Sequence, residues 1–418
     1  MSENKAGQQI DVAVLGAGIV GISAGIAARQ RGLSVVVIDR REPGSETSYG
    51  NAGILSSGSI LPLNQPSLWS ALPGYLGNTS AALRWNPMWV MRNLDWVARF
   101  LGNAMPSRKR PRAIALHGLI GASLKLHREW IVKAGAPQRI RETGWLKAWR
   151  SDATETAKRE QAFLAEFGIE SELLDRQAIS ALEPNILPVY KTGLLHTQTA
   201  SVDSPGAVVK AYAQMLRGLG GEVRQSDIRG IEPKDGGWRV VLGDGALSAR
   251  HVVVALGPWS ADLLRPLGYR VPLAVERGYH QEFTPNPARA LQRPIHDAEG
   301  SFLMSPMENG IRVTSGVELT DRDAPSSLAQ LDMVVPLARG VVEFGLAVAE
   351  PWRGARPTLP DSLPMIGQAP RHQGLWLAFG NQHIGFTTGP ATGAAIAAMI
   401  AGDKPSFDAR AFAPGRYI

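Results

Sequence analysis

The sequence predicts an α/β protein that contains a Rossmann-like domain, and three observations predict it. A short apolar run, Val12–Leu15, leads directly into a glycine-rich turn at residues 16–21, and a helical stretch, Ile22–Arg31, follows. A second apolar run, Val35–Ile38, comes next. A strand, a glycine turn, a helix and a strand in this order form the βαβ unit that opens a parallel sheet. The 418 residues suffice for two to three domains of about 150 residues.

Composition predicts a folded globular chain and excludes several kinds of chemistry. Hydrophobic residues make up 44% of the chain and charged residues 19%, so apolar burial can offset the entropy of ordering. Because the chain has no cysteine, disulfides, thiolate metal sites and cysteine nucleophiles are excluded. The polar start, Met1–Ile10, lacks a basic-then-apolar signal pattern, and no apolar run reaches about 18 residues. We therefore expect a cytoplasmic protein without a membrane-spanning helix.

The glycine turn has the spacing of a dinucleotide-binding motif. Gly16 permits the tight turn, Gly18 lets the backbone approach a pyrophosphate, and Gly21 lets the helix and strand pack closely. Free N–H groups at the helix N-terminus, with roughly half a positive charge, would then face the anion. Asp39 ends the second strand, where this unit places the carboxylate that binds ribose. The pattern predicts a bound dinucleotide.

The next residues narrow the choice of cofactor. Asp39 would repel a ribose phosphate, which disfavours NADP despite the neighbouring Arg40 and leaves FAD or NAD. Residues 44–54 then combine glycines with polar side chains that could reach a pyrophosphate and a ring system. The candidate cofactor residues in this segment are Thr47, Ser48, Asn51, Ala52 and Gly53.

Four segments together resemble one family of flavoproteins. They are the opening glycine motif, Thr47-Ser48-x-x-Asn51-Ala52-Gly53, residues 252–260 (Val-Val-Val-Ala-Leu-Gly-Pro-Trp-Ser), and Arg356-Pro357-x-x-Pro360-Asp361-x-x-Pro364-x-Ile366-Gly367. These four segments, in this order along the chain, resemble those of the FAD-dependent D-amino acid oxidase superfamily. The resemblance is strongest to bacterial D-amino acid dehydrogenases and hydroxyproline dehydrogenase-like proteins. The resemblance implies noncovalent FAD, since no cysteine exists and no histidine lies in the opening segment.

The flavin-related segments are separated along the chain, which predicts a discontinuous FAD-binding domain. Its pieces are residues 1–60, 195–270 and 355–418, and a substrate-binding domain takes residues 61–194 and 271–354. The resemblance implies that this second, α+β domain is a mixed sheet with helices that covers the flavin. Further cofactor residues expected from the resemblance and the local pattern are Val223, at the adenine end, and Ala255, Gly257 and Trp259.

A small set of residues could hold an amino acid. The resemblance implies that Arg356 binds the substrate carboxylate through its planar fork, and Arg353 is the alternative. Tyr279 could close the site or contact the carboxylate, or it could be a core residue. His280 follows it on a strand, so only one of the two is expected to face the site. His383, in a loop near the C-terminus, could line the site or be satisfied by backbone groups.

The helix that begins near that loop is the last cofactor element. Gly385, Thr387 and Thr388 precede the small-residue stretch Ala391–Ala401. The resemblance implies that its N-terminus faces the pyrimidine edge of the flavin and stabilises the reduced ring. We expect no metal site, because the eight histidines show no ligand spacing, and no serine hydrolase, because G-x-S-x-G is absent.

Residues 69–101 form a tryptophan-rich stretch, and it overlaps a basic segment. Seven Lys and Arg stand against one Asp between residues 84 and 112. A helix from Pro87, with Asn86 as its N-cap, would place arginines on one side and Trp89 and Trp96 on the other. Such a helix packs into the core or lies on an anionic membrane. No nucleic-acid-binding motif accompanies the positive charge, so nucleic acid is not an expected partner.

Two functions follow from these features. The first is FAD-dependent oxidative deamination of a small amino or imino acid, D-configured or hydroxyproline-like, with hydride transfer from Cα to flavin N5 and electrons passed to a quinone or another acceptor. The second is a flavin-holding subunit of a multi-protein electron-transfer or amine dehydrogenase complex without independent activity. An NAD-linked dehydrogenase is a third alternative. The sequence gives no indication of the oligomeric state.

Overall fold

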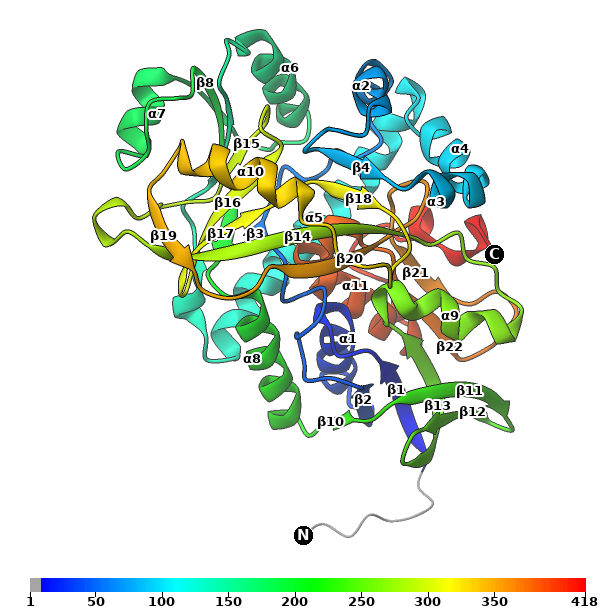
Figure 1. Ribbon diagram of the computed structural model, residues 1–418. Helices are drawn as coiled ribbons and strands as arrows, with labels where there is room; N and C mark the ends of the chain where they lie inside the picture. Colours follow the sequence, from blue (N-terminus) through cyan, green and yellow to red (C-terminus); the bar gives the residue numbers. More distant parts are fainter. Residues whose placement is uncertain (1–8) are drawn as a thin grey trace.

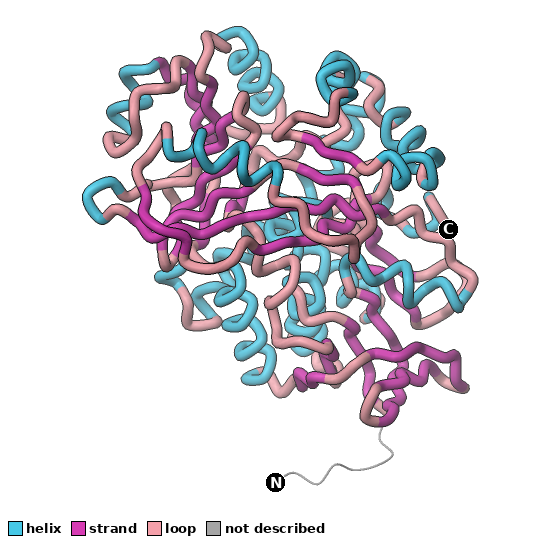
Figure 2. Tube along the Cα trace, viewed as in Figure 1, coloured by secondary structure: helices cyan, strands magenta, loops and turns pink. Residues whose placement is uncertain are grey.

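The computed structural model describes residues 9–418, so most of the polar start of the chain lies outside the described residues. Two large β-sheets dominate it. In Figure 1, strands β14 and β20 cross above helix α1, and strands β1, β2 and β10–β13 of the first sheet lie below it. Figure 2 shows the same two groups of strands with helices around both. The α/β fold with a mixed second sheet, expected from the sequence, is confirmed.

The first sheet is the Rossmann-like sheet. Its parallel strands are ordered β10-β2-β1-β13-β22, and β1 lies between β2 and β13. Strands β11 and β12 extend the N-terminal half of β13 as an antiparallel meander, and β21 pairs with β22. The bounds are β1 Ile10–Leu15, β2 Val35–Asp39, β10 Glu222–Gln225, β11 Ile228–Lys234, β12 Gly237–Leu242, β13 Gly245–Val254, β21 Met365–Gln368 and β22 Leu375–Phe379.

Four helices share one core on a face of this sheet. They are α1 Ile19–Arg29, α5 Pro106–Lys133, α8 Pro205–Gly218 and α11 Gly385–Ile400. Helix α1 is almost entirely buried and rich in small residues, which lets it pack closely against α11. Helix α5, whose residues were assigned to the substrate domain, packs here against α11 and α8. Sequence alone could not show this, because its partners lie about 100 and 270 residues further along the chain.

The second sheet carries the predicted substrate region. Its order is β4-β18-β14-β17-β16-β15-β6-β8-β7, and β19 and β20 also pair with β14. One face is apolar and is covered by α10 Ala329–Arg339 and α7 Arg176–Leu182. The strand bounds are β4 Leu83–Trp85, β6 Trp145–Trp149, β7 Glu172–Asp175, β8 Thr192–His196, β14 Ala274–Pro285, β15 Ile295–Asp297, β16 Phe302–Met307, β17 Gly310–Thr314, β18 Val317–Leu319, β19 Phe344–Ala347 and β20 Trp352–Thr358.

Two of the predicted domain boundaries fall inside strands of the second sheet. Strand β8 ends at His196 and β20 ends at Thr358, and both belong to the second sheet. Residues 195–196 and 355–358, assigned to the first domain, therefore lie in the second sheet. A small third sheet links the two regions: β3 Ile54–Leu55 and β5 Ile140–Arg141 pair with β9 Ala200–Val202.

The helix predicted to begin at Pro87 is two short helices instead of one. Asn86 accepts hydrogen bonds from the N–H groups of Met88 and Trp89, as expected of an N-cap, and α3 spans Pro87–Arg92. The chain then breaks at Asn93, and α4 spans Leu94–Gly102. Helices α2 (Ser67–Leu76), α3 and α4 gather near β4 (Figure 1). None of the helices within residues 9–418 combines the length and apolarity needed to cross a membrane.

Candidate active site

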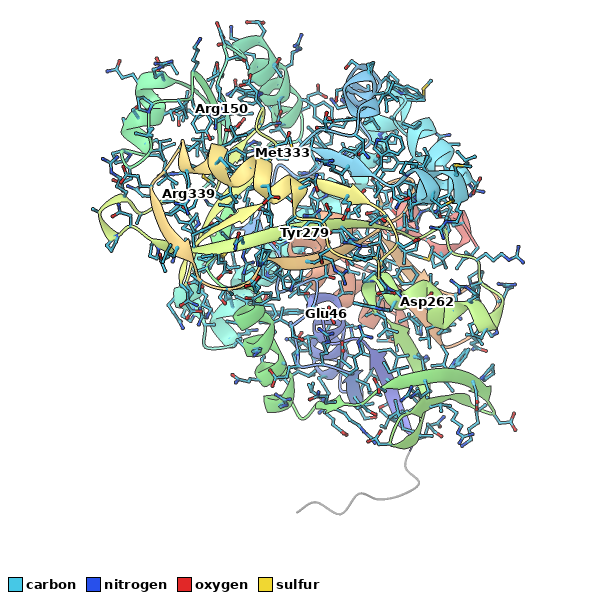
Figure 3. The ribbon with its side chains drawn as sticks, viewed as in Figure 1. Glu46, Arg150, Asp262, Tyr279, Met333 and Arg339 are labelled. Atoms are coloured by element: carbon cyan, nitrogen blue, oxygen red, sulfur yellow. The ribbon has the colours of Figure 1, made fainter. Side chains whose placement is uncertain are left out.

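A cavity of about 490 Å³ lies between the two sheets, a size typical of small-molecule and cofactor sites. At one end it is lined by the turn before α1 and by the end of β2, and at the other by β14, β20 and the loop before α11. In Figure 3, the labelled Glu46 lies below β20 near α1, Asp262 lies on α9 (Ser260–Leu264), and Tyr279 marks β14. Segments from both predicted domains therefore meet at one cavity.

The glycine turn has the geometry that its spacing predicts. Gly16 has φ +112°, and a side chain on it would meet the carbonyl oxygen of Ala255 at 2.3 Å. A Cβ on Gly21 would lie 1.8 Å from the Gly16 carbonyl oxygen. Gly18 lines the cavity, where α1 begins without a side-chain cap of its own. Gly16 and Gly21 therefore shape the turn, and Gly18 borders the space above it.

The charged and hydroxyl groups around this turn are held by backbone contacts. Both carboxylate oxygens of Asp39 accept backbone N–H groups, from Ala17 at 2.7 Å and Arg41 at 3.0 Å. Ser48 Oγ accepts the N–H of Ile19 at 3.0 Å, and Thr47 Oγ1 donates to the Ala355 carbonyl on β20 at 3.0 Å. Asp39, Thr47 and Ser48 all line the cavity.

The loop after β13 forms the next part of the wall. Ala255, Gly257 and Trp259 line the cavity. The Arg40 guanidinium lies 4.5 Å from the centre of the Trp259 ring, a cation–π contact. Val223 was expected at the same end, but it does not line this cavity. It pairs with Val37 in the sheet and packs against the core of the α1 layer, whereas residues 227–229 border the cavity.

Segment 49–53 is held against the second sheet by Arg312 on β17. This buried arginine donates to the carbonyls of Tyr49, at 2.8 Å, and Asn51, at 2.5 Å, and pairs with Glu282 on β14. Asn51 lines the cavity and donates to the His383 carbonyl at 3.3 Å. Ala52 and Gly53 lie outside the lining, and Gly53 contacts the backbone of β9.

Of the three residues expected to contact the cofactor at the beginning of α11, one lines the cavity. Gly385 lines it. Thr387 donates to the Ile54 carbonyl at 3.0 Å, and Thr388 donates to the Ile384 carbonyl at 3.0 Å. Both threonines are buried and outside the lining, so they hold the helix start in place. Gln382, which the sequence did not single out, lines the cavity in a left-handed conformation, φ +51°.

Arg356 lies on the cavity wall with very few partners. Strand β20 pairs with β14, so Arg356 lies directly opposite Glu276. Its guanidinium lies over Gly278, because a Cβ on that glycine would be 2.1 Å from Nη2. The one side-chain hydrogen bond that it makes within the described residues is a long one, 3.4 Å to the Gly316 carbonyl. Burial lowers the pKa of Arg356, and Glu276 opposes that shift.

The register of β14 with β20 places Arg353, the alternative arginine, and Tyr279 on the face of the sheet opposite Arg356. Cross-strand partners share a face, and Arg353 pairs with Tyr279 on the face opposite Arg356. Arg353 is exposed and donates to the Ala324 carbonyl at 2.6 Å. The Tyr279 side chain is in the apolar core below α10, and its hydroxyl donates to Glu318 and accepts from Ser327 N–H. Tyr279 is among the residues that line the cavity, but its side chain packs in this core, so the structure favours the core alternative that the sequence left open.

The His280 side chain lies on the face of β14 that carries Gly278 and Glu276, opposite the side chain of Tyr279. Its ring stacks on Trp352, with centroids 5.0 Å apart and planes 18° apart, and both residues line the cavity. Burial and the nearby Arg312 lower the pKa of His280 to about 2. His383 also lines the cavity, and burial and Arg356 lower its pKa to about 4. Both imidazoles are therefore neutral near pH 7, able to accept or donate hydrogen bonds.

Known proteins match the chain over nearly its whole length. A family model described as FAD dependent oxidoreductase (DAO) matches residues 11–399. The chain belongs to this family. It is 29% identical to a D-amino-acid oxidase from Bradyrhizobium diazoefficiens, over 97% of this chain and 99% of that protein. It is also 29% identical to a D-amino acid dehydrogenase from Rhizobium johnstonii, with the same coverage. Glycine oxidase from Geobacillus kaustophilus shares the fold, with a TM-score of 0.77, 20% identity and coverage of 98% and 99%.

As a DAO-family protein, the chain is an FAD-dependent oxidoreductase, and the cavity fits this cofactor. The glycine turn and Asp39 fit the pyrophosphate and ribose of a dinucleotide. The space continues to the second sheet, where an extended ring can lie between the Gly385 end of α11 and the Gly278–His280 stretch. Within residues 9–418, no three His, Asp or Glu side chains come together as metal ligands.

Three residues of this DAO-family site were not predicted from the sequence: Arg312, Trp352 and Gln382. Arg312 is an arginine in the middle of an ordinary strand, and its role depends on a loop about 260 residues earlier. Trp352 was one of eleven tryptophans without a distinguishing pattern. Gln382 immediately precedes the expected His383, and its positive φ has no sequence signal. In this part of the site the sequence offered one usable signal, the strand alternation that places Tyr279 and His280 on opposite faces.

Proposed function

We propose that this protein oxidises a small amino or imino acid and that Arg356 binds the substrate carboxylate. One observation carries the proposal. Guanidinium N–H groups are costly to bury without acceptors, yet Arg356 lies at the junction of the cofactor cavity and the second sheet with one long hydrogen bond. Its planar fork can accept a carboxylate in two parallel, charge-assisted hydrogen bonds. The names of the relatives, an oxidase and a dehydrogenase of D-amino acids, support the same substrate class.

The residues around Arg356 would orient the rest of the substrate. Arg356 fixes the carboxylate, which leaves Cα and the amine to be positioned by the neighbouring walls. His383 is uncharged, so it does not repel a substrate amine and can accept a hydrogen bond from it. Trp352, stacked on His280, provides an apolar surface that excludes water. When bound, FAD supplies the two-electron acceptor, and the protein's residues supply binding and orientation.

An anaerobic titration tests this function. The purified, FAD-loaded protein is mixed with D-amino acids, L-amino acids and cyclic imino acids, and the absorbance of oxidised flavin is recorded. We expect at least one compound to bleach it, with a 2-oxo acid plus ammonia, or a cyclic imine, as product. If the protein is yellow but its flavin stays oxidised with every compound, the proposal is contradicted and a flavin-holding subunit of a complex is favoured. Reoxidation by oxygen, compared with a quinone, then distinguishes an oxidase from a dehydrogenase.

A quinone acceptor would require contact with a membrane, and the α2–α4 region provides a candidate surface. Two tryptophans expected at that surface are buried, Trp89 at 4% exposed and Trp96 at 6%, whereas Trp69 on α2 is 46% exposed. Three of the seven cations of residues 84–112, Arg92, Arg99 and Arg110, form ion pairs, as in the Arg92–Asp321 bridge of 2.7 Å. Met91 and Leu94 nevertheless expose more than 60% of their area to solvent. We propose that these apolar side chains insert into an anionic membrane surface.

Vesicle sedimentation checks the membrane proposal. We expect the protein to sediment with phosphatidylglycerol vesicles at low salt and to be released as salt rises, since surface charges are screened. Leu94→Glu should reduce binding, because it puts an anion on the apolar surface. Leu346→Glu is the matched control: Leu346 is 82% exposed but lies on β19, away from α4. Failure to bind at low salt, or equal binding by both variants, would eliminate this surface.

A further inference from the structure

Glu276 is a buried acid next to Arg356 that the proposed function does not use. It is 2% exposed and lies directly opposite Arg356 in the β14–β20 pair. Cross-strand partners point to the same side of a sheet. Thr358, also on β20, lies nearby, and its hydroxyl donates to the Arg356 carbonyl at 3.5 Å. One carboxylate oxygen of Glu276, Oε2, is buried without a hydrogen-bond partner among residues 9–418. A buried carboxylate with an unpaired oxygen is costly to ionise.

The surroundings of Glu276 leave Arg356 as the charge that balances it. Ala274, two residues earlier on the same face, packs with Trp89 and Trp96 in an apolar cluster. The nearest strand partner on β18 is Leu319. The charged groups Arg277 and Glu318 pair with each other on the opposite face of the sheet. Solvent and other cations are therefore kept away from Glu276.

Opposing influences act on the protonation of Glu276. Burial raises its pKa to about 7, and Arg356 and Thr358 oppose that shift. Of the other titratable groups near Arg356, His383 has its pKa lowered to about 4 and His280 to about 2. Neither imidazole changes charge near neutrality. Glu276 is the group of this cluster whose charge can change in that range.

We propose that Glu276 is the counter-ion of Arg356 in the free site and takes up a proton when a carboxylate binds to Arg356. The inference rests on the proposed function. A bound carboxylate adds a second negative charge beside one guanidinium, and like charges in a buried site disfavour ionisation of both. The proton comes from solvent, up to one per ligand bound, and the site keeps its net charge. Glu276 is thus a positioning residue, because it acts through Arg356 without touching the substrate.

The sign of the pH dependence follows from proton uptake. Below the pKa of free Glu276 the group already carries its proton, so a carboxylate binds at full affinity. Above that pKa, binding must first supply the proton, so the affinity falls as pH rises, approaching tenfold per pH unit. Benzoate is a suitable probe, because it has a carboxylate and no amine that titrates in this range or can be oxidised.

The experiment measures benzoate binding to the FAD-loaded protein from roughly pH 6 to 9, by the change in the flavin spectrum. Calorimetry in two buffers of different ionisation enthalpy counts the protons taken up. We expect wild-type affinity to fall with pH and Glu276→Gln to bind with nearly pH-independent affinity and no uptake. Glu318→Gln, a neutralised acid on the opposite face, should keep the wild-type profile.

Each result decides the inference. If the wild type binds benzoate without proton uptake, the inference is overturned, even if Glu276→Gln fails to fold. A pH profile of affinity in Glu276→Gln that matches the wild type would also overturn it. Either result leaves the proposed function standing, provided that amino acids still reduce the flavin. If neither benzoate nor any amino acid perturbs the flavin spectrum of the wild type, the proposed function fails and this inference with it.

Discussion

Replacing Arg356 by alanine will raise KM for the amino acid substrate strongly and lower kcat less. Removing one partner of a buried, charge-assisted pair costs about 2 to 5 kcal/mol, which corresponds to roughly 30-fold to several thousand-fold in kcat/KM. The effect falls mainly on KM, because the carboxylate is bound in both the ground state and the transition state. Steady-state kinetics with the best substrate from the anaerobic titration measures it.

Two further substitutions make the Arg356 result specific. Arg356→Lys keeps the charge but loses the planar fork, so its KM should lie between those of wild type and Arg356→Ala. Arg353→Ala removes an arginine three residues away whose side chain is exposed and on the other face of β20. It should leave KM nearly unchanged. A large effect of Arg353→Ala with none from Arg356→Ala would show that the substrate carboxylate binds elsewhere.

The cofactor half of the site could be predicted because its determinants are local in sequence. Gly16, Gly18 and Gly21 act within one turn, and Asp39 ends the next strand of the same βαβ unit. Their spacing therefore specifies their relative positions before any distant segment is known. The position of Val223, outside the cavity lining, could not be predicted for the opposite reason. It belongs to a later strand, and whether its side chain faces the cavity or the core depends on pairing with β2.

The substrate half depends on pairing between distant strands, which sequence spacing does not give. Strand alternation showed that Tyr279 and His280 face opposite ways, but the register with β20 decides which of them shares a face with Arg356. The close approach of the guanidinium to Gly278 depends on the same register. The burial of Trp89 and Trp96 likewise depends on Ala274, far along the chain. Periodicity shows that a helix has an apolar side but not what covers it.

Gly21→Ala tests the cofactor turn and should be the most damaging single methyl group that can be added there. The new Cβ would lie 1.8 Å from the Gly16 carbonyl oxygen and 3.3 Å from Val14 Cγ1. The carbonyl is backbone and cannot rotate away, so the turn itself must move. Overpacking of a buried site typically costs about 1 to 3 kcal/mol, and displacement of the turn also moves the N-terminus of α1 away from the pyrophosphate position. We expect a lowered Tm and little bound FAD.

The matched control adds the same methyl group where the chain has room. Gly121 lies inside α5, and a Cβ there would meet no atom within 4 Å. Because alanine favours a helix interior over glycine by about 0.5 to 1 kcal/mol, Gly121→Ala should keep its FAD and its Tm should stay or rise. The flavin-to-protein absorbance ratio and thermal unfolding of both variants measure the difference. Full FAD occupancy in Gly21→Ala would mean that the turn can relax without losing the pyrophosphate site, and that close packing of α1 on β1 is not what holds the cofactor.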